Sequence, residues 1–208
     1  MTGLMINKIE NYLDEIIPNP KCELNYNKDY ELLIATMLSA QTTDKKVNQV
    51  TEILFKKYKT LEELANANIE DIKRIIKPIG TYNIKAKNTI EIANILKELN
   101  CVPNDREFLE KMPGVGRKTT NVVLSNLYNV PCIAVDTHVE RVSKRLGLAP
   151  KNADVRKVEK MLTKQINKER LCRMHHQLVL FGRYYCKSQN PQCKNCKLTD
   201  ICKYQKNK

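Results

Sequence analysis

Apolar residues return at helical spacing along almost the whole chain, and this periodicity restricts the fold more than any other feature of the sequence. Leu32, Leu33, Met37 and Leu38 fall on one helix face, and residues 47–54 repeat the pattern. No run of residues alternates between apolar and polar in the way that a half-buried strand requires. We therefore predict an all-α fold.

Residues suited to helix ends stand between the periodic segments. Asn104 or Asp105 can cap a helix over residues 108–112, and Asp136 stands where a later helix is expected to begin. Gly147 can close that later helix in the left-handed conformation that glycine adopts freely. The sequence thus predicts many helices joined by short turns.

An excess of basic residues indicates a polyanionic partner. The 208 residues include 36 Lys and Arg against 23 Asp and Glu, which makes the formal net charge +13 at pH 7. Clustered cations bind nucleic acid by releasing counterions from its phosphates. Trp is absent and aromatic residues make up only 6% of the chain, so stacking of unpaired bases is disfavoured and duplex binding is favoured.

No segment is apolar enough to predict a membrane span. The longest apolar stretch covers residues 32–40 and is interrupted by Thr36 and Ser39, whereas a spanning helix needs about 20 apolar residues. Lys8 and Glu10 stand where a signal peptide would need its apolar core. We therefore expect no membrane association and a cytoplasmic location, with contact to the nucleoid through DNA binding.

Eight cysteines in a chain expected to be cytoplasmic indicate free thiols or metal ligands rather than disulfides. Four of them lie scattered among apolar neighbours, and we interpret these as small buried hydrophobic residues. These four are Cys22, Cys101, Cys132 and Cys172.

The other four cysteines are bunched near the C-terminus. They are Cys186, Cys193, Cys196 and Cys202, which fall within 17 residues. Zinc sites with four thiolates mostly pair two Cys-x2-Cys motifs, and only Cys193 and Cys196 form one here, so the spacing leaves zinc and an iron–sulfur centre open. Lys187 and Lys194 give this basic segment side chains that can reach phosphates.

Two glycine-containing turns have the composition of phosphate-binding hairpins. Residues 112–118 place Gly114, Val115 and Gly116 before Arg117 at an expected helix start, where consecutive backbone N–H groups can point at an anion. An ordinary helix-to-helix turn has the same composition. A second turn contains Gly80, Thr81 and Tyr82, so two hairpins can contact one duplex.

Several segments together are similar, in order and spacing, to the endonuclease III family of helix-hairpin-helix DNA glycosylases. They are Leu38–Gln41, Gly80–Asn83, Met112–Thr119, Val135–His138 and the cysteine tail. The resemblance implies a base-excision repair glycosylase with abasic-site lyase activity that acts on damaged duplex DNA. It also implies a six-helix barrel over residues 23–131, with the hairpin motif at about 106–128, and a [4Fe–4S] cluster domain formed by residues 1–22 and 132–208.

The resemblance also assigns roles to single residues. Lys118 would be the nucleophile and Asp136 its assistant, facing each other in a cleft between the two domains. Gln41 would fill the space left by an extruded nucleotide, and the Gly80–Tyr82 loop would approach the opposite strand. Thr81 stands where better-known members carry a bulky apolar residue. The four clustered cysteines would hold the [4Fe–4S] cluster, and a monomer is expected.

The chemistry explains why a lysine is required. Excising a base and then cutting the strand needs a nucleophile at the deoxyribose C1′ that can become an iminium, which a primary amine does and a hydroxyl or thiol does not. A lysine in water has a pKa of ~10.4, so the reaction needs surroundings that favour its free-base form. An aspartate nearby can stabilise the cationic sugar and relay the amine's proton.

Alternative functions follow from the same features. On the same fold, a pyrimidine-dimer or mismatch glycosylase is possible, although mismatch relatives generally replace the nucleophilic lysine. From another class, a non-catalytic iron–sulfur protein that binds duplex DNA, or an electron carrier, would explain the charge or the cysteines. Neither of these needs Lys118 together with Asp136.

Overall fold

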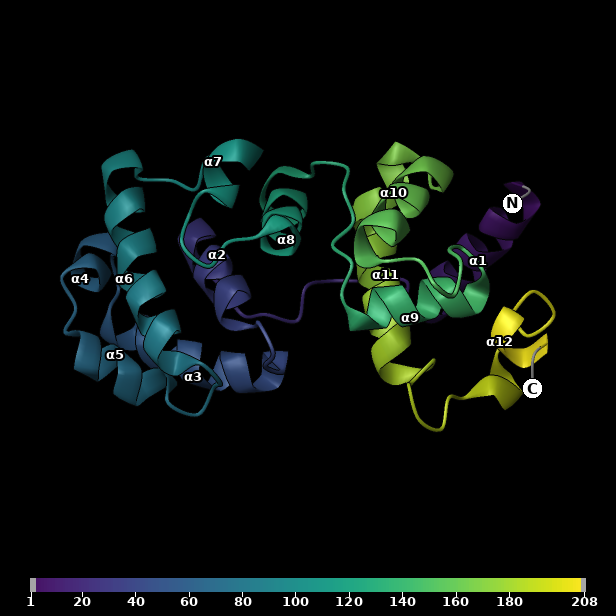
Figure 1. Ribbon diagram of the computed structural model, residues 1–208, viewed down its shortest axis with the longest axis horizontal. Coiled ribbons are helices and arrows are strands. Elements are labelled where there is room, and N and C mark those ends of the chain that lie inside the picture. The colour runs from purple at the N-terminus through teal and green to yellow at the C-terminus, as the bar shows by residue number, and fades with distance from the viewer. Residues whose placement is uncertain (1–2, 207–208) are drawn as a thin grey trace. The chain divides into compact units, whose positions relative to one another are not determined.

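The computed structural model describes residues 3–206, and over this range it contains helices and no strand (Figure 1). The predicted all-α class is confirmed. The chain divides into two compact units, Cys22–Tyr128 and a second unit formed by Met1–Lys21 with Asn129–Lys208. Among the described helices, none combines the length and the hydropathy that crossing a bilayer demands.

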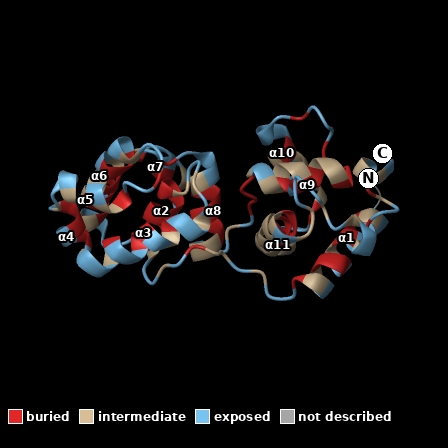
Figure 2. Cartoon of the chain, turned by 90° about the horizontal axis from the view of Figure 1, so that it is seen from below, coloured by how far each residue is buried: buried red, intermediate tan, exposed pale blue. Residues whose placement is uncertain are grey.

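The Cys22–Tyr128 unit is built around one buried helix. Its helices are α2 (Asp29–Leu38), α3 (Asp44–Lys57), α4 (Leu61–Ala65), α5 (Ile69–Ile76), α6 (Tyr82–Leu99), α7 (Arg106–Glu110) and α8 (Arg117–Tyr128). Every residue of α2 after Asp29 is buried, because α3, α6 and α8 all pack against it (Figure 2). The outer helices bury one face only, which is the amphipathic pattern that the sequence shows.

Side-chain caps set the starts of the short helices in this unit. Thr60 accepts a hydrogen bond from the backbone N–H of Glu63 (3.1 Å) at the start of α4, and Asn68 caps α5 in the same way. The predicted cap before α7 is Asp105, which accepts from the N–H of Phe108 at 3.0 Å. These caps satisfy helix donors that would otherwise lack acceptors.

The second unit draws its core from both ends of the chain. Its helices are α1 (Gly3–Ile16), α9 (Thr137–Leu146), α10 (Val155–Gln165), α11 (Leu171–Tyr184) and α12 (Lys203–Lys206), with 3-10 turns at Lys168–Arg170 and Cys193–Asn195. Ile9 and Leu13 of α1 share one apolar core with Val139 and Leu178. Gly182 lets α11 approach α9 closely, because a Cβ there would lie 2.8 Å from the Cβ of His138.

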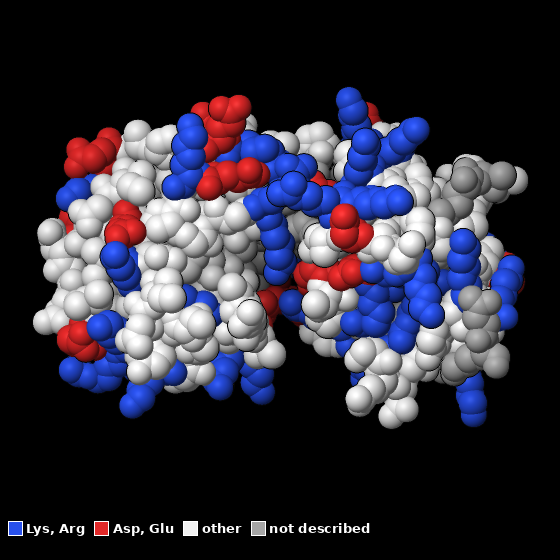
Figure 3. Space-filling model, viewed as in Figure 1, with Lys and Arg blue, Asp and Glu red and all other residues white. Residues whose placement is uncertain are grey.

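The excess positive charge is concentrated in this second unit. Its sequence carries 20 Lys and Arg against 9 Asp and Glu, whereas the Cys22–Tyr128 unit carries 16 against 14. Figure 3 shows basic side chains outnumbering acidic ones on the viewed face. Long-range attraction to a polyanion therefore comes mainly from the unit that contains the cysteine tail.

One correction concerns the scattered cysteines. Cys132 is buried as predicted, and Cys22 and Cys172 are half-buried. Cys101 is exposed, so the prediction of burial is wrong there. The reason is local: Asn100 takes a left-handed conformation (φ 54°) at the end of α6, and Cys101 then lies in a surface turn.

Asp14 makes the stability of the second unit depend on pH. Burial acts to raise the pKa of Asp14, but hydrogen bonds from Gln177, Arg173 and Arg170 outweigh it and hold the pKa below its usual value. The stabilisation is therefore present above the unfolded-state pKa and is lost as the pH falls through the folded one. We expect Asp14→Asn to lower the melting temperature at pH 7.

Thermal melts of both proteins across pH check this prediction. The difference between wild type and Asp14→Asn should shrink as the pH falls below about 4, where the carboxylate becomes protonated. A difference that stays constant down to pH 2 would contradict it.

Candidate functional site

The turn between α7 and α8 has the geometry predicted for an anion-binding hairpin. The side chains of Met112 and Val115 are buried, and the N–H of Val115 donates to the carbonyl of Met112 at 3.1 Å, which closes the turn. Gly114 has φ +73°, and a Cβ there would lie 2.4 Å from Nδ2 of Asn88. Gly116 faces open space. The turn is thus anchored on one side and accessible at the start of α8, where helix N–H groups lack internal acceptors.

The two glycines of this turn should respond differently to substitution. Gly114→Ala forces a side chain into both a left-handed conformation and Asn88, so we expect a loss of about 2 kcal/mol in the free energy of unfolding. Gly116→Ala should leave the melting temperature unchanged and weaken DNA binding by about tenfold, because its methyl group occupies the space through which a phosphate reaches the backbone.

Thermal melts and a duplex-binding titration of the two variants separate these effects. Equal destabilisation by both substitutions, or unchanged duplex affinity of Gly116→Ala, would contradict the interpretation of the turn as a phosphate site.

Lys118 lies in the first turn of α8, directly after the glycine turn, and is exposed. Its position agrees with the helix start that the sequence predicts after the glycine turn. The side chain is open to solvent, so a bound partner can reach the amine.

Asp136 is the N-cap of α9 in the second unit, as predicted. One carboxylate oxygen, Oδ1, accepts from the backbone N–H groups of His138 (2.9 Å) and Val139 (2.8 Å). The residue is half-buried. Because both cap bonds use the same oxygen, Oδ2 takes no part in them, and a cap and a chemical role are compatible in one side chain.

The predicted DNA-contacting loops of the Cys22–Tyr128 unit carry two residues in left-handed conformations. Gln41, in the turn after α2, has φ 57° and an exposed side chain. Thr81 precedes α6 with φ 55° and is also exposed, and its hydroxyl donates to the carbonyl of Gly80 at 2.7 Å. A β-branched residue with positive φ is rare, and such strain concentrates at functional loops.

Helix α6 brings these loops and the hairpin together. Thr81 and Tyr82 stand at its N-terminus, and the buried side chain of Lys85 reaches the turn that carries Gln41. One turn further along, Asn88 abuts Gly114 of the hairpin. Three segments far apart in sequence are thus placed by a single rigid helix.

The four clustered cysteines lie in the second unit, after α11. Cys202 is buried, and Cys186, Cys193 and Cys196 are half-buried. Among the described residues, no three His, Cys, Asp or Glu side chains converge as a ready metal site. Burial nevertheless raises the pKa of the Cys186 and Cys196 thiols, and the charges of Cys186 and Cys202 add to this effect at Cys196.

Arg145 of α9 organises the start of this cysteine segment. Its guanidinium donates to the carbonyls of Cys186 (3.3 Å), Lys187 (2.6 Å) and Ser188 (3.1 Å), and to Sγ of Cys186 at 3.4 Å. It also lies over the ring of Tyr204, 4.2 Å from the centroid. The exposed side chain of Lys187 therefore extends from a backbone that is tied to α9.

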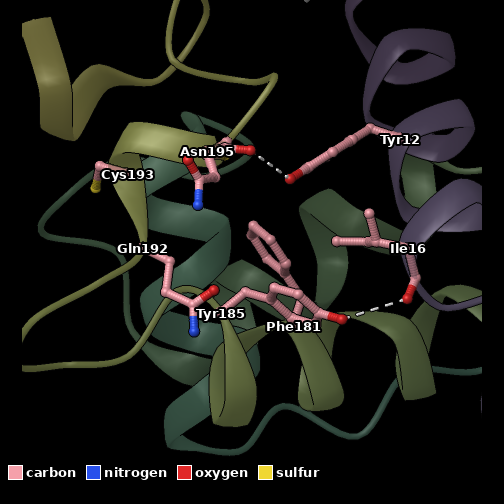
Figure 4. Close-up of a pocket in the computed structure, with 8 residues that line it drawn as sticks. Tyr12, Ile16, Phe181, Tyr185, Gln192, Cys193 and Asn195 are labelled. Carbon is pink, nitrogen blue, oxygen red and sulfur yellow. Dashed lines mark hydrogen bonds between the residues drawn. The ribbon is translucent and has the colours of Figure 1, made fainter.

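An aromatic cavity of about 260 Å³ adjoins the cysteine segment (Figure 4). The hydroxyl of Tyr12 donates to the carbonyl of Asn195 at 3.4 Å, and that of Tyr185 to Ile16 at 3.5 Å. The ring of Phe181 fills the space between them, and Cys193 stands at the edge with its sulfur turned away from the rings. Cys193 and Cys196 thus belong to the wall of this cavity, but the sulfur of Cys193 points out of it.

The sequence interpretation missed Lys85, Asn88 and Arg145. A signal for Lys85 was available, because it falls on the buried stripe of α6 with Thr89, Ile92 and Leu96. A lysine at a core position of a helical repeat is uncommon and usually has a specific reason. Asn88 and Arg145 offered no such signal, since their partners are distant in sequence.

The sequence of this chain is similar to those of known DNA repair proteins. Residues 34–168 match the family model of the HhH-GPD superfamily base excision DNA repair protein. Endonuclease III of Bacillus subtilis (strain 168) is 47% identical over 205 residues, covering 96% of this chain and 94% of that protein. Endonuclease III of Escherichia coli (strain K12) is 45% identical over 194 residues, covering 92% of each.

The structure of this chain is also similar to solved structures of DNA repair proteins. A trapped endonuclease III–DNA covalent intermediate matches with a TM-score of 0.93 at 45% identity, covering 100% of this chain and 98% of that one. A thermostable thymine-DNA glycosylase matches with a TM-score of 0.84 at 22% identity, which shows a shared fold. The predicted resemblance is confirmed. The chain belongs to the HhH-GPD superfamily of base excision DNA repair proteins and, within it, to the endonuclease III family.

Proposed function

We propose that this protein removes oxidised pyrimidines from damaged duplex DNA and then cuts the strand 3′ to the abasic site by β-elimination. It is a DNA glycosylase with abasic-site lyase activity, acting as a monomer in the cytoplasm on nucleoid DNA. The Cys22–Tyr128 unit would correspond to the six-helix barrel predicted over residues 23–131, and the remainder to the cluster domain.

One observation carries the proposal: an exposed lysine in the first turn of α8 follows directly on an accessible glycine turn. A phosphate held by backbone N–H groups at Gly114–Gly116 would place the neighbouring deoxyribose within reach of Lys118. The closing DNA would also exclude water from the amine. Arg117, exposed beside it, adds positive charge for the same phosphodiester backbone.

The steps balance without a further reactant apart from water. The Nζ atom of Lys118 bonds to C1′ as the glycosidic bond breaks, and the departing base takes up a proton. Opening of the sugar ring gives an iminium between Lys118 and C1′. Loss of the acidified C2′ proton then expels the 3′ phosphate, and hydrolysis of the iminium restores the amine.

The negative charge of Asp136 would assist this reaction. A carboxylate beside the sugar stabilises the cationic character that develops as the glycosidic bond breaks. It can also relay the proton that the amine of Lys118 has to lose. The cap bonds to His138 and Val139 fix the carboxylate at the start of α9, so it needs little reorganisation during the reaction.

The lesion has to leave the stack before C1′ is accessible, and a damaged base costs less to extrude than an intact one. Gln41 would fill the vacated position, and the Gly80–Tyr82 loop would contact the other strand. The exposed lysines Lys187 and Lys194 of the cysteine segment would bind phosphates.

A [4Fe–4S] cluster would be held by Cys186, Cys193, Cys196 and Cys202. The donor set fits such a group: Cys202 is buried, the other three cysteines are half-buried, and the charges of Cys186 and Cys202 act on Cys196, which a bound cationic centre would offset. The cluster would supply cross-linking of the C-terminal segment rather than bond chemistry on DNA. With the four cysteines linked in this way, the loop between them would hold Lys187 and Lys194 in fixed positions for contact with DNA.

We expect anaerobically purified protein to be brown, with absorption near ~400 nm and bound iron and sulfide. Replacing Cys202, the buried member of the four, with Ser should remove the colour and lower the melting temperature. Iron analysis and visible spectra check this, with Cys101→Ser, an exposed cysteine outside the set, as the matched control. Stoichiometric zinc without iron would contradict the assignment.

The test of the proposed function is borohydride trapping during turnover. A thymine-glycol duplex incubated with the wild-type protein and borohydride should yield a covalent adduct, and peptide mapping should place the DNA on Lys118. A panel of duplexes with oxidised pyrimidines, a pyrimidine dimer, mismatches or an abasic site identifies the substrate class. No adduct with any of them would refute the proposal.

A further inference from the structure

Lys85 is an almost completely buried cation, with only 4% of its surface exposed, in the first turn of α6. Desolvation by burial lowers the pKa of Lys85. Its hydrogen bonds within the described residues go to two backbone carbonyls and a hydroxyl, and no carboxylate is among these partners. Burial of an ammonium without a carboxylate partner costs free energy. The groups that accept its hydrogen bonds therefore indicate which part of the structure Lys85 stabilises.

All three acceptors belong to the end of α2 and the turn that follows it. The Nζ atom of Lys85 lies 2.9 Å from the carbonyl of Leu38, 2.8 Å from that of Ala40 and 3.4 Å from Oγ1 of Thr42. An ammonium has three N–H donors, so this set uses its full capacity. Leu38 is the last residue of α2, where a cation also stabilises the negative end of the helix dipole.

Gln41 stands between the residues that Lys85 binds. Its φ of 57° is unfavourable for a residue with a side chain, by about 1–2 kcal/mol. Bonds within the turn also cross Gln41: the N–H of Thr42 donates to the carbonyl of Ser39 at 3.0 Å, and the hydroxyl of Thr42 donates to the carbonyl of Ala40 at 3.4 Å. From outside the turn, Lys85 adds bonds to residues on both sides of Gln41 and so fixes the conformation that keeps Gln41 exposed.

The backbone of the same residue is tied to the second loop. The N–H of Lys85 donates to the carbonyl of Thr81 at 3.1 Å, where Thr81 has φ 55°. One residue thus connects the Gln41 turn to the Gly80–Tyr82 loop, although the two are about 40 positions apart in the chain. Movement of either loop would break bonds that Lys85 makes.

We propose that Lys85 is a positioning residue for base extrusion, which rests on the proposed function. It holds the Gln41 turn rigid so that the Gln41 side chain enters the vacated position, and it sets the distance from Gln41 to the loop that faces the opposite strand. Lys85 itself touches neither the sugar nor the base. Its loss should slow extrusion of a stacked lesion while sparing strand cleavage at a site that has already lost its base.

The test compares Lys85→Met, which keeps the length and apolar stem of the side chain but removes its donors, with Lys87→Met. Lys87 is exposed on the same helix and makes an ion pair at 3.7 Å with Glu91, so its loss should have no effect. Single-turnover rates on a thymine-glycol duplex should fall by about 10–100-fold for Lys85→Met. Rates on an abasic duplex should fall by less than about threefold, because no base has to be extruded.

A double-mutant cycle with Gln41→Ala separates positioning from general destabilisation. If Lys85 acts through Gln41, the Lys85→Met, Gln41→Ala double variant should be no slower than the slower single variant, and Lys85→Arg should recover part of the loss. Multiplied losses, or equal losses on the lesion and abasic duplexes, would overturn the inference.

Thr42→Val provides a second route should Lys85→Met fail to fold. It removes the hydroxyl that accepts from Lys85 and that itself donates to the carbonyl of Ala40. We expect a loss of a few-fold on the lesion duplex that disappears in the Gln41→Ala background, and an unchanged rate overturns the inference. Borohydride trapping by the wild type keeps the two hypotheses apart. Absence of trapping refutes the proposed function, whereas trapping with an additive cycle refutes only the role of Lys85.

Discussion

Lys118→Ala should eliminate the borohydride-trapped adduct and lower strand cleavage at a lesion by about 10³-fold or more, the scale on which enzymes lose activity when a covalent nucleophile is removed. The residue is exposed at the start of α8, so its truncation opens no cavity and should leave the melting temperature unchanged. Duplex binding should also persist, because the backbone N–H groups of the Gly114–Gly116 turn are unaffected.

The measurement is a single-turnover nicking assay beside a binding titration. Lys97→Ala, a lysine of α6 outside the proposed site, is the matched control and should nick and trap like the wild type. Excision of the base by Lys118→Ala at the wild-type rate would show that another group attacks C1′. Loss of binding together with loss of nicking would place Lys118 among the phosphate contacts instead.

Asp136→Asn is the second substitution with a large expected effect. Asn is as good an N-cap as Asp, so the bonds to His138 and Val139 can be kept while the negative charge is lost. We expect the excision rate to fall by about 100-fold, the scale of one lost electrostatic contact in a transition state, with an unchanged melting temperature.

Asp136→Ala provides the comparison, because it removes the cap as well as the charge. Its melting temperature should fall, corresponding to about 1 kcal/mol for a lost N-cap, with an excision rate similar to that of Asp136→Asn. Excision rates and thermal melts of both variants check this. An Asp136→Asn variant as active as the wild type would reduce Asp136 to a structural cap.

Local features of the fold were predictable because their causes lie within a few residues of each other. The N-caps at Asp105 and Asp136 and the left-handed Gly147 depend on bonds to backbone groups two to five positions away, and the structure contains all three. The periodic apolar faces likewise predicted the helical class without knowledge of partners. The glycine hairpin was recognisable for the same reason, since its shape follows from Gly114 itself.

Burial was less predictable, because it depends on residues far along the chain. An apolar neighbourhood in the sequence suggested that Cys101 is buried, but the turn after Asn100 carries it to the surface. In the opposite sense, Lys85 carries a charge and is only 4% exposed, and the sequence signals this burial only through its place on the apolar stripe of α6.

The sequence by itself determined the helical class, the positions of the turns and the residue types available for chemistry, because these rest on short-range backbone geometry and on side-chain identity. Only the tertiary structure decided that α6 places the Gln41 turn, the Gly80–Tyr82 loop and the hairpin relative to one another. The contacts responsible join Lys85 to Ala40 and Asn88 to Gly114, and nothing local encodes them. They arise because packing of α2 and α6 around a common core brings distant backbone groups within hydrogen-bonding distance.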